Sequence, residues 1–223
     1  MKNIVLIEDK LPRMEFLCKE KELNLTEIKE LTIISDSKFE SLKKSIGKSE
    51  FNLLEGFKAI MSHHSAWSQK ELDSIKEYCK KTNTVLILFS GGISVTHLRT
   101  SKPQVLLIDV ERFYSNRLIL FIDAFIKSEE LNLPILQYGK NWKINVLMET
   151  RNNLAVFLSR NPGIEVLDYY EESIKLPQAL YSISDEFELD LSWYENGIRQ
   201  NAYQVLTELN KQLTSAIKKV LFQ

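Results

Sequence analysis

Two pairs of polar residues stand at the ends of apolar runs. Glu8 and Asp9 follow the apolar run that opens the chain, and His63 and His64 end a second run. Carboxylates and imidazoles transfer protons and ligate divalent cations, so both pairs are candidates for chemistry. In an open α/β domain, ligands bind beyond the carboxyl ends of parallel strands. We therefore expect these pairs to lie near one edge of a sheet.

A third candidate group is the turn Ser90-Gly91-Gly92, which follows the apolar run 85–89. Glycine lets backbone N–H groups approach an anion, so the turn is a candidate site for a phosphate or a nucleotide. Together with His63 these residues make up the predicted ligand-binding set. The alternative interpretation is a tight turn after a buried strand.

An enzyme could combine three of these side chains. Ser90 is the candidate nucleophile, His64 the candidate base, and Asp9 the acid that would orient the imidazole. The turn is not a Gly-x-Ser-x-Gly elbow, because Leu88 occupies the place of the leading glycine. A hydrolase of this kind stays open as an alternative function.

A divalent metal site is a further possibility. Glu8 and Asp9 are candidate ligands for Mg²⁺ or another divalent cation, because carboxylate oxygens suit such ions. Adjacent residues of a strand point to opposite faces of the sheet, so His63 and His64 do not easily share one ion. A metal-dependent phosphoesterase using Asp9, His64 and Ser90 belongs to the same alternative.

Elements able to position these residues follow from the apolar pattern. Short apolar runs alternate with helical patterns, which predicts βαβ units and a parallel sheet. The predicted strands are 3–7, 31–35, 57–62, 84–89 and 104–108, and the predicted helices are 12–21, 38–46 and 69–80. Ser68 and Glu71 form a capping box for the third of these helices.

The second half is less regular. The pattern predicts helices at 115–131 and 142–159, short strands at 134–138 and 164–167, an irregular acidic stretch at 168–191, and one amphipathic helix over 193–221. The strip of the last helix either packs within the protein or binds a second copy. We expect residues 1–131 to form the α/β domain and 132–223 an α/β-to-helical extension packed on it as one compact unit.

Residues 1–130 resemble the receiver domain of response regulators in the order of their elements and in their strand ends. Glu8 and Asp9 are similar to the acidic pair that holds Mg²⁺ there, and Ser90 to the hydroxyl residue after the fourth strand. The resemblance implies an α/β fold with a flavodoxin-like open parallel sheet, helices on both faces and, here, a long C-terminal helix. If the chain is a regulatory module, we expect the strand-end cleft and the helix after strand four to form its recognition face.

Two departures set the chain apart from a working receiver. His63 and His64 stand where the phosphate-accepting Asp belongs, and Asp109-Val-Glu111 follows the fifth strand, where a receiver has Lys. The resemblance therefore points to a pseudo-receiver, a regulatory module without standard aspartyl phosphorylation. In such a module, Asp9→Asn is expected to leave stability unchanged or raise it, because neighbouring acids repel.

Composition narrows the choice of partners. The 223 residues carry a formal net charge of −1, so no overall field attracts nucleic acid or anionic lipid. No apolar run approaches the roughly 20 residues that span a bilayer. We expect a cytoplasmic protein, outside the membrane, that binds a partner protein or forms a homodimer through its C-terminal helix.

Overall fold

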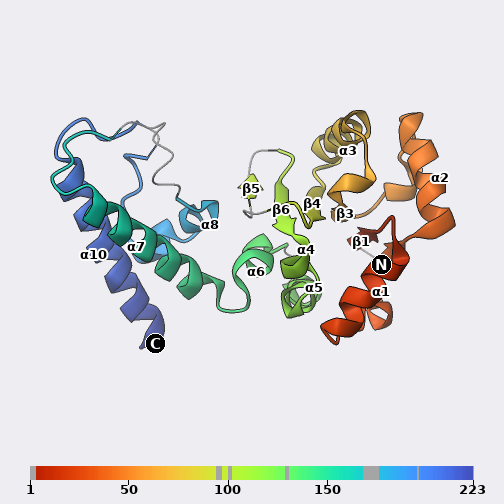
Figure 1. The fold of residues 1–223 in the computed structure, drawn as a ribbon, viewed down its shortest axis with the longest axis horizontal. Coiled ribbons are helices and arrows are strands. Elements are labelled where there is room, and N and C mark those ends of the chain that lie inside the picture. Colours follow the sequence, from red (N-terminus) through yellow and green to blue (C-terminus); the bar gives the residue numbers. More distant parts are fainter. Residues whose placement is uncertain are drawn as a thin grey trace. The chain divides into compact units, whose positions relative to one another are not determined.

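The predicted parallel sheet forms the centre of the first part of the chain (Figure 1). A computed structural model describes residues 4–93, 97–99, 102–128, 131–167, 176–194 and 196–222. Its strands are β1 (Ile4–Ile7), β2 (Leu31–Ile34), β3 (Ala59–His63), β4 (Val85–Ser90), β5 (His97–Arg99) and β6 (Val105–Asp109).

The strand order is β2-β1-β3-β4-β6-β5. All pairs are parallel except β5 with β6, which is antiparallel and forms the edge. The five parallel strands have the flavodoxin-like order, which confirms the predicted fold class. The order reverses between β1 and β3, so the carboxyl ends of these two strands form the switch point where such sheets bind ligands.

Helices and short 3₁₀ turns connect these strands. The first part contains α1 (Leu11–Glu20), α2 (Asp36–Gly47), α3 (Gln69–Thr82), α4 (Val110–Phe113), α5 (Asn116–Ser128), α6 (Leu133–Tyr138) and the turns Leu25–Glu27, Asn52–Leu54 and His64–Ala66. The predicted capping box is confirmed: the Glu71 N–H and the Ser68 hydroxyl meet at 3.4 Å, and the Ser68 N–H donates to the Glu71 carboxylate at 2.7 Å.

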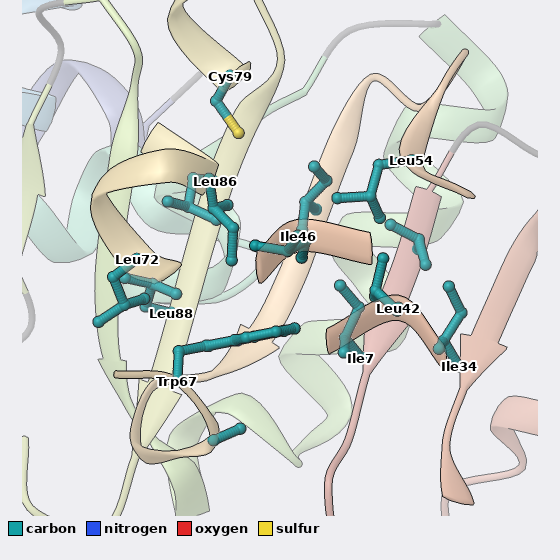
Figure 2. Packing of buried hydrophobic residues seen from close by; sticks show 14 of the residues in the cluster. Ile7, Ile34, Leu42, Ile46, Leu54, Trp67, Leu72, Cys79, Leu86 and Leu88 are labelled. Carbon is teal, nitrogen blue, oxygen red and sulfur yellow. The ribbon is translucent and has the colours of Figure 1, made fainter. Parts of the chain in front are cut away.

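One face of the sheet is covered by α2 and α3, which bury an aliphatic core around Trp67 (Figure 2). Ile7, Leu42, Leu72 and Leu88 come from four different elements and are at most 2% exposed. Burying each such side chain stabilises the fold by about 1.5–3 kcal/mol. Alternate strand residues therefore point to the other face, where α1, α4 and α5 lie (Figure 1).

The connection from β4 to β6 differs from the expectation. The described residues between these strands form a turn and the edge strand β5. The expectation of a helix after strand four is therefore wrong. Because β5 runs antiparallel to β6, the chain reaches β6 through a hairpin and needs no crossover helix.

A short helix, α6, replaces the strand predicted at 134–138. Pro134 lies in its first turn, where the missing N–H costs no hydrogen bond. A short apolar run does not distinguish a buried strand from a buried helical turn, which explains this wrong prediction.

Contacts divide the chain into two compact units, Met1–Lys140 and Asn141–Gln223. The boundary follows α6 rather than residue 131, because α6 packs against α5. Packing of the second unit on the first stays a prediction. The helices of the second unit are α7 (Trp142–Arg160), α8 (Gln178–Tyr181), α9 (Ser184–Phe187) and α10 (Ala202–Leu221).

Within the second unit, α10 begins at Ala202 and not at residue 193. Asn201 has a φ of 55°, a left-handed conformation that cannot continue a helix. The strand predicted at 164–167 is a single antiparallel bridge between Leu167 and Ile198. The predicted irregular stretch contains α8 and α9, and its residues 168–175 lie outside the described residues.

The apolar strip of α10 packs against α7 (Figure 1). Leu206, Leu209 and Leu213 are buried within the second unit. Across the described part of the chain, no helix combines the length and the apolar character needed to cross a bilayer.

Candidate functional site

Glu8 is a buried acid at the carboxyl end of β1. Its carboxylate accepts hydrogen bonds from the Tyr114 hydroxyl at 2.9 Å and from the Lys10 N–H at 3.2 Å. The side chain is fully shielded from solvent. A buried carboxylate must be paired or hydrogen-bonded, and each of these donors stabilises Glu8 where it lies.

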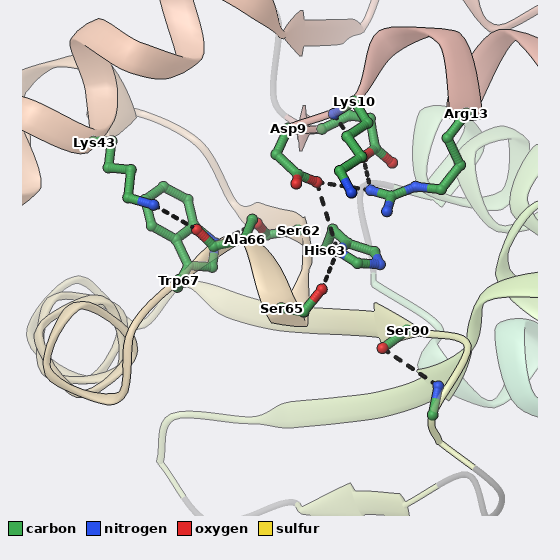
Figure 3. Close-up of polar contacts among 12 residues, drawn as sticks. Asp9, Lys10, Arg13, Lys43, Ser62, His63, Ser65, Ala66, Trp67 and Ser90 are labelled. Carbon is green, nitrogen blue, oxygen red and sulfur yellow. Dashed lines mark hydrogen bonds and ion pairs between the residues drawn. The ribbon is translucent and has the colours of Figure 1, made fainter.

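Arg13 joins the two acids. Its Nη2 atom contacts Glu8 Oε1 and lies 2.7 Å from Asp9 Oδ1. Figure 3 shows Arg13 reaching toward Asp9. Asp9 lies two residues before α1 and Arg13 lies in the first turn of that helix, four residues further along the chain. One guanidinium therefore occupies the position between the two carboxylates.

The two acids titrate differently. Burial raises the pKa of Glu8, and the hydrogen bonds from Tyr114 and Arg13 offset this effect only in part. Burial would also raise the pKa of Asp9, but hydrogen bonds with Glu8 and Arg13 lower it below its usual value. Asp9 therefore stays ionised to a lower pH than Glu8 does, and its negative charge pairs with Arg13.

His63 completes the cluster from the neighbouring strand. Its Nδ1 atom lies 3.5 Å from Asp9 Oδ1 and 3.0 Å from the Ser65 hydroxyl (Figure 3). Its ring meets Phe89 edge-on, with centroids 5.6 Å apart. Burial, together with the charge of Arg13, lowers the pKa of His63 to about 4. The imidazole is therefore neutral near pH 7, where it can accept or donate a hydrogen bond but carries no charge.

His64 lies apart from this cluster. It is exposed in the turn after β3 and lines a cavity with Lys76 and Lys80 of α3. The structure thus brings His63, and not His64, to Asp9. The two histidines belong to different elements, because β3 ends at His63 and His64 begins the 3₁₀ turn His64–Ala66.

Ser90 also differs from the expected catalytic arrangement. Its hydroxyl accepts a hydrogen bond from the Gly92 N–H at 3.4 Å (Figure 3). Neither Gly91 nor Gly92 has a positive φ, and an added Cβ at Gly92 would meet nothing within 4 Å. The backbone conformation of this turn therefore does not require glycine at either position. Asp9 and His63 make their described contacts with other residues than Ser90.

Asp109 has a structural task. It is the register partner of Ser90, and its carboxylate accepts from the Glu111 and Arg112 N–H groups at 2.9 and 3.3 Å. These bonds cap the first turn of α4. The acid after β6 thus starts a helix.

Two residues of the cluster escaped the sequence analysis. Arg13 had a local signal, because a basic residue four positions after an acid in a helix can pair with it. Tyr114 had none, since it meets Glu8 across 106 residues of sequence.

The acidic pair does not fit a resident divalent cation as it is arranged. Oxygens of both carboxylates already accept from the Arg13 guanidinium. In the part of the chain that the structure describes, no group of three or more His, Cys, Asp or Glu side chains could hold a metal ion. What the arrangement offers is a closed cluster in which one guanidinium bridges two carboxylates.

Comparisons with protein-family models, with curated proteins and with solved structures found no match to this chain.

Proposed function

We propose that this chain is a regulatory protein-interaction module of the pseudo-receiver type that undergoes no standard aspartyl phosphorylation. The observation that carries the proposal is the bridge from Arg13 to Glu8 and Asp9. A receiver needs this position for the cation that neutralises an incoming phosphoryl group. The Arg13 guanidinium pairs with both acids but, unlike a metal ion, has no coordination site to offer a phosphoryl group.

The neighbouring residues support the same conclusion. The strand end that should carry the phosphate acceptor carries His63, which is buried and neutral near pH 7. The strand end that should carry the Lys carries Asp109, whose carboxylate caps α4. Each position of the phosphorylation site is occupied by a group with a structural contact.

A phosphorylation assay tests this proposal. The protein is incubated with acetyl phosphate and Mg²⁺, and its intact mass is measured. We expect no added phosphoryl group in the wild type and none in Asp9→Asn. Stoichiometric phosphorylation of the wild type that is lost in Asp9→Asn would overturn the proposal.

The enzyme alternative is tested separately. Nitrophenyl esters and phosphoesters are offered with and without Mn²⁺ or Zn²⁺. We expect no turnover above that of a buffer control. Turnover that disappears in Ser90→Ala or His64→Ala would instead favour the hydrolase, and the exposed Ser37→Ala variant serves as a matched control.

The partner is proposed to be another protein. A homodimer through α10 would have to use exposed residues such as Tyr203 and Leu221, because the leucine strip of that helix is buried within the second unit. Light scattering after gel filtration measures the mass in solution. A dimer that dissociates in Leu221→Glu would assign the partner to a second copy.

A further inference from the structure

A cavity of about 430 Å³ lies beside β6. Its apolar lining includes Leu88 of β4 and Val105 and Leu107 of β6. The register pairs Leu88 with Leu107, so the two side chains point to the same face of the sheet. This is the face that α3 covers further along, because Leu88 and Val105 belong to the core beneath α2 and α3.

The cavity exists because of the unusual connection described above. Parallel strands are normally covered by helices on both faces, and the crossover helix supplies that cover. Between β4 and β6 the described chain forms an edge hairpin instead. Leu107 is consequently only half-buried, although its neighbour Leu106 on the other face is fully buried.

Positive charge gathers around this opening. Lys76 and Lys80 of α3 and Lys102 before β6 line it, against the single carboxylate of Glu77. Lys76 and Lys80 lie one helical turn apart and thus on one side of α3. Lys76 has an exposed ion pair with Asp73 at 3.3 Å, which is worth little and is easily exchanged.

From these contacts we infer that the lysine-rimmed cavity, defined by Leu88, Val105, Leu107, Lys76, Lys80 and Lys102, binds an acidic amphipathic segment of a partner protein. The apolar residues of the segment enter the cavity, and its carboxylates pair with the three lysines. The volume lies within the roughly 300–1,000 Å³ of ordinary binding pockets. A helix in such a groove presents its anchors from one face.

Charge complementarity selects this occupant. Three lysines against one glutamate disfavour a basic segment, since like charges brought together at an interface are costly. The inference rests on the proposed function, because it names the kind of partner that the module would bind.

A peptide library tests the inference. Phage display presents 16-residue peptides that have Asp and Glu fixed on one helical face and random apolar residues on the other. The best binder is labelled, and its affinity for the full chain is measured by fluorescence anisotropy. We expect binding that weakens at least tenfold in the variant Lys76→Glu/Lys80→Glu/Lys102→Glu, and that weakens with added salt.

The matched control reverses three exposed lysines on and just after α2, as Lys38→Glu/Lys44→Glu/Lys48→Glu. It makes the same change in net charge at another place and should keep the wild-type affinity. Thermal melts of both variants confirm that each one folds. If the cavity variant fails to fold, amide shift mapping on the wild type replaces it, and shifts should centre on Leu107 and Lys80.

The outcomes separate the inference from the proposed function. An equal loss of peptide affinity in both triple variants, or amide shifts centred elsewhere, would show that the cavity is not the binding site. The proposal of an interaction module would be unaffected. Recovery of no acidic binder, or preferred binding of an oligonucleotide, would overturn the acidic segment as the occupant. Failure of the proposed function itself would appear only in the phosphorylation and turnover assays.

Discussion

The Tyr114 hydroxyl donates a hydrogen bond of 2.9 Å to Glu8 Oε2, and both side chains are fully buried. The tyrosine ring meets Phe89 and Phe113 edge-on, with centroids 5.4 and 5.0 Å away. This contact joins the end of β1 to the residue that follows α4. It fixes the orientation of the Glu8 carboxylate and leaves the other oxygen for Arg13.

Removal of the Tyr114 hydroxyl is expected to destabilise the fold. In Tyr114→Phe a buried carboxylate loses a donor, which should lower the free energy of unfolding by about 1.5–3 kcal/mol. Urea denaturation measures this difference. Tyr203→Phe, at an exposed position in α10, is the control and should change stability by less than about 0.5 kcal/mol. Equal effects of the two substitutions would argue against a role for the hydrogen bond.

Arg13 is expected to be the most sensitive position of the cluster. Arg13→Met leaves Glu8 and Asp9 without their cation, and loss of one partner from a buried ion pair costs about 3–5 kcal/mol. Because Arg13 is itself 27% exposed, we expect the lower end of that range. The triple variant Glu8→Gln/Asp9→Asn/Arg13→Met should recover part of the loss. An unchanged unfolding midpoint in Arg13→Met would contradict the bridge.

Asp9→Asn is expected to behave differently from what the sequence suggested. Two neighbouring acids predicted a neutral or stabilising effect, but Asp9 lies 2.7 Å from the Arg13 guanidinium. We expect a loss of about 1 kcal/mol, as for a partly exposed ion pair. A double-mutant cycle with Arg13→Met isolates that pair. The control is Asp123→Asn on the exposed side of α5. A stabilising effect of Asp9→Asn would show that repulsion between the Glu8 and Asp9 carboxylates outweighs the pairing with Arg13.

His63 should make the fold sensitive to mild acid. Its pKa is about 4 in the folded protein and near 6.5 when unfolded. The unfolded chain therefore binds a proton first, and His63 costs stability as the pH falls from about 6.5 towards 4. The loss should reach about 2–3 kcal/mol at pH 4. Stability is measured by urea denaturation between pH 4 and 7.5.

The control for this pH dependence is His63→Gln, which keeps a polar side chain but does not titrate. The raised pKa of Glu8 acts in the opposite direction, because burial favours its protonated form and stability falls as the pH rises. Subtracting the variant's curve from the wild-type curve removes that contribution. Parallel curves for the two proteins would show that His63 does not titrate on unfolding.

Much of the fold is readable from local patterns. Buried parallel strands are near-continuous apolar runs, and the five strands predicted between residues 3 and 108 start and end within about two residues of observed strands. The amphipathic pattern and the capping box identified α3 in the same way. The hairpin of β5 and β6 was not predicted. β5 has only three residues, too few for a clear apolar pattern, and it forms only by pairing with the free edge of β6.

The amino-acid sequence by itself determined the alternation of strands and helices, the acids after β1 and the histidines after β3. These follow from periodicity and from chain order, which are local. Only the tertiary structure decided what those side chains contact. His63 rather than His64 meets Asp9 because His63 ends β3 beside the carboxyl end of β1, whereas His64 is exposed in the turn that follows. Tyr114 reaches Glu8 because folding brings together residues 106 positions apart, and no local pattern encodes that distance.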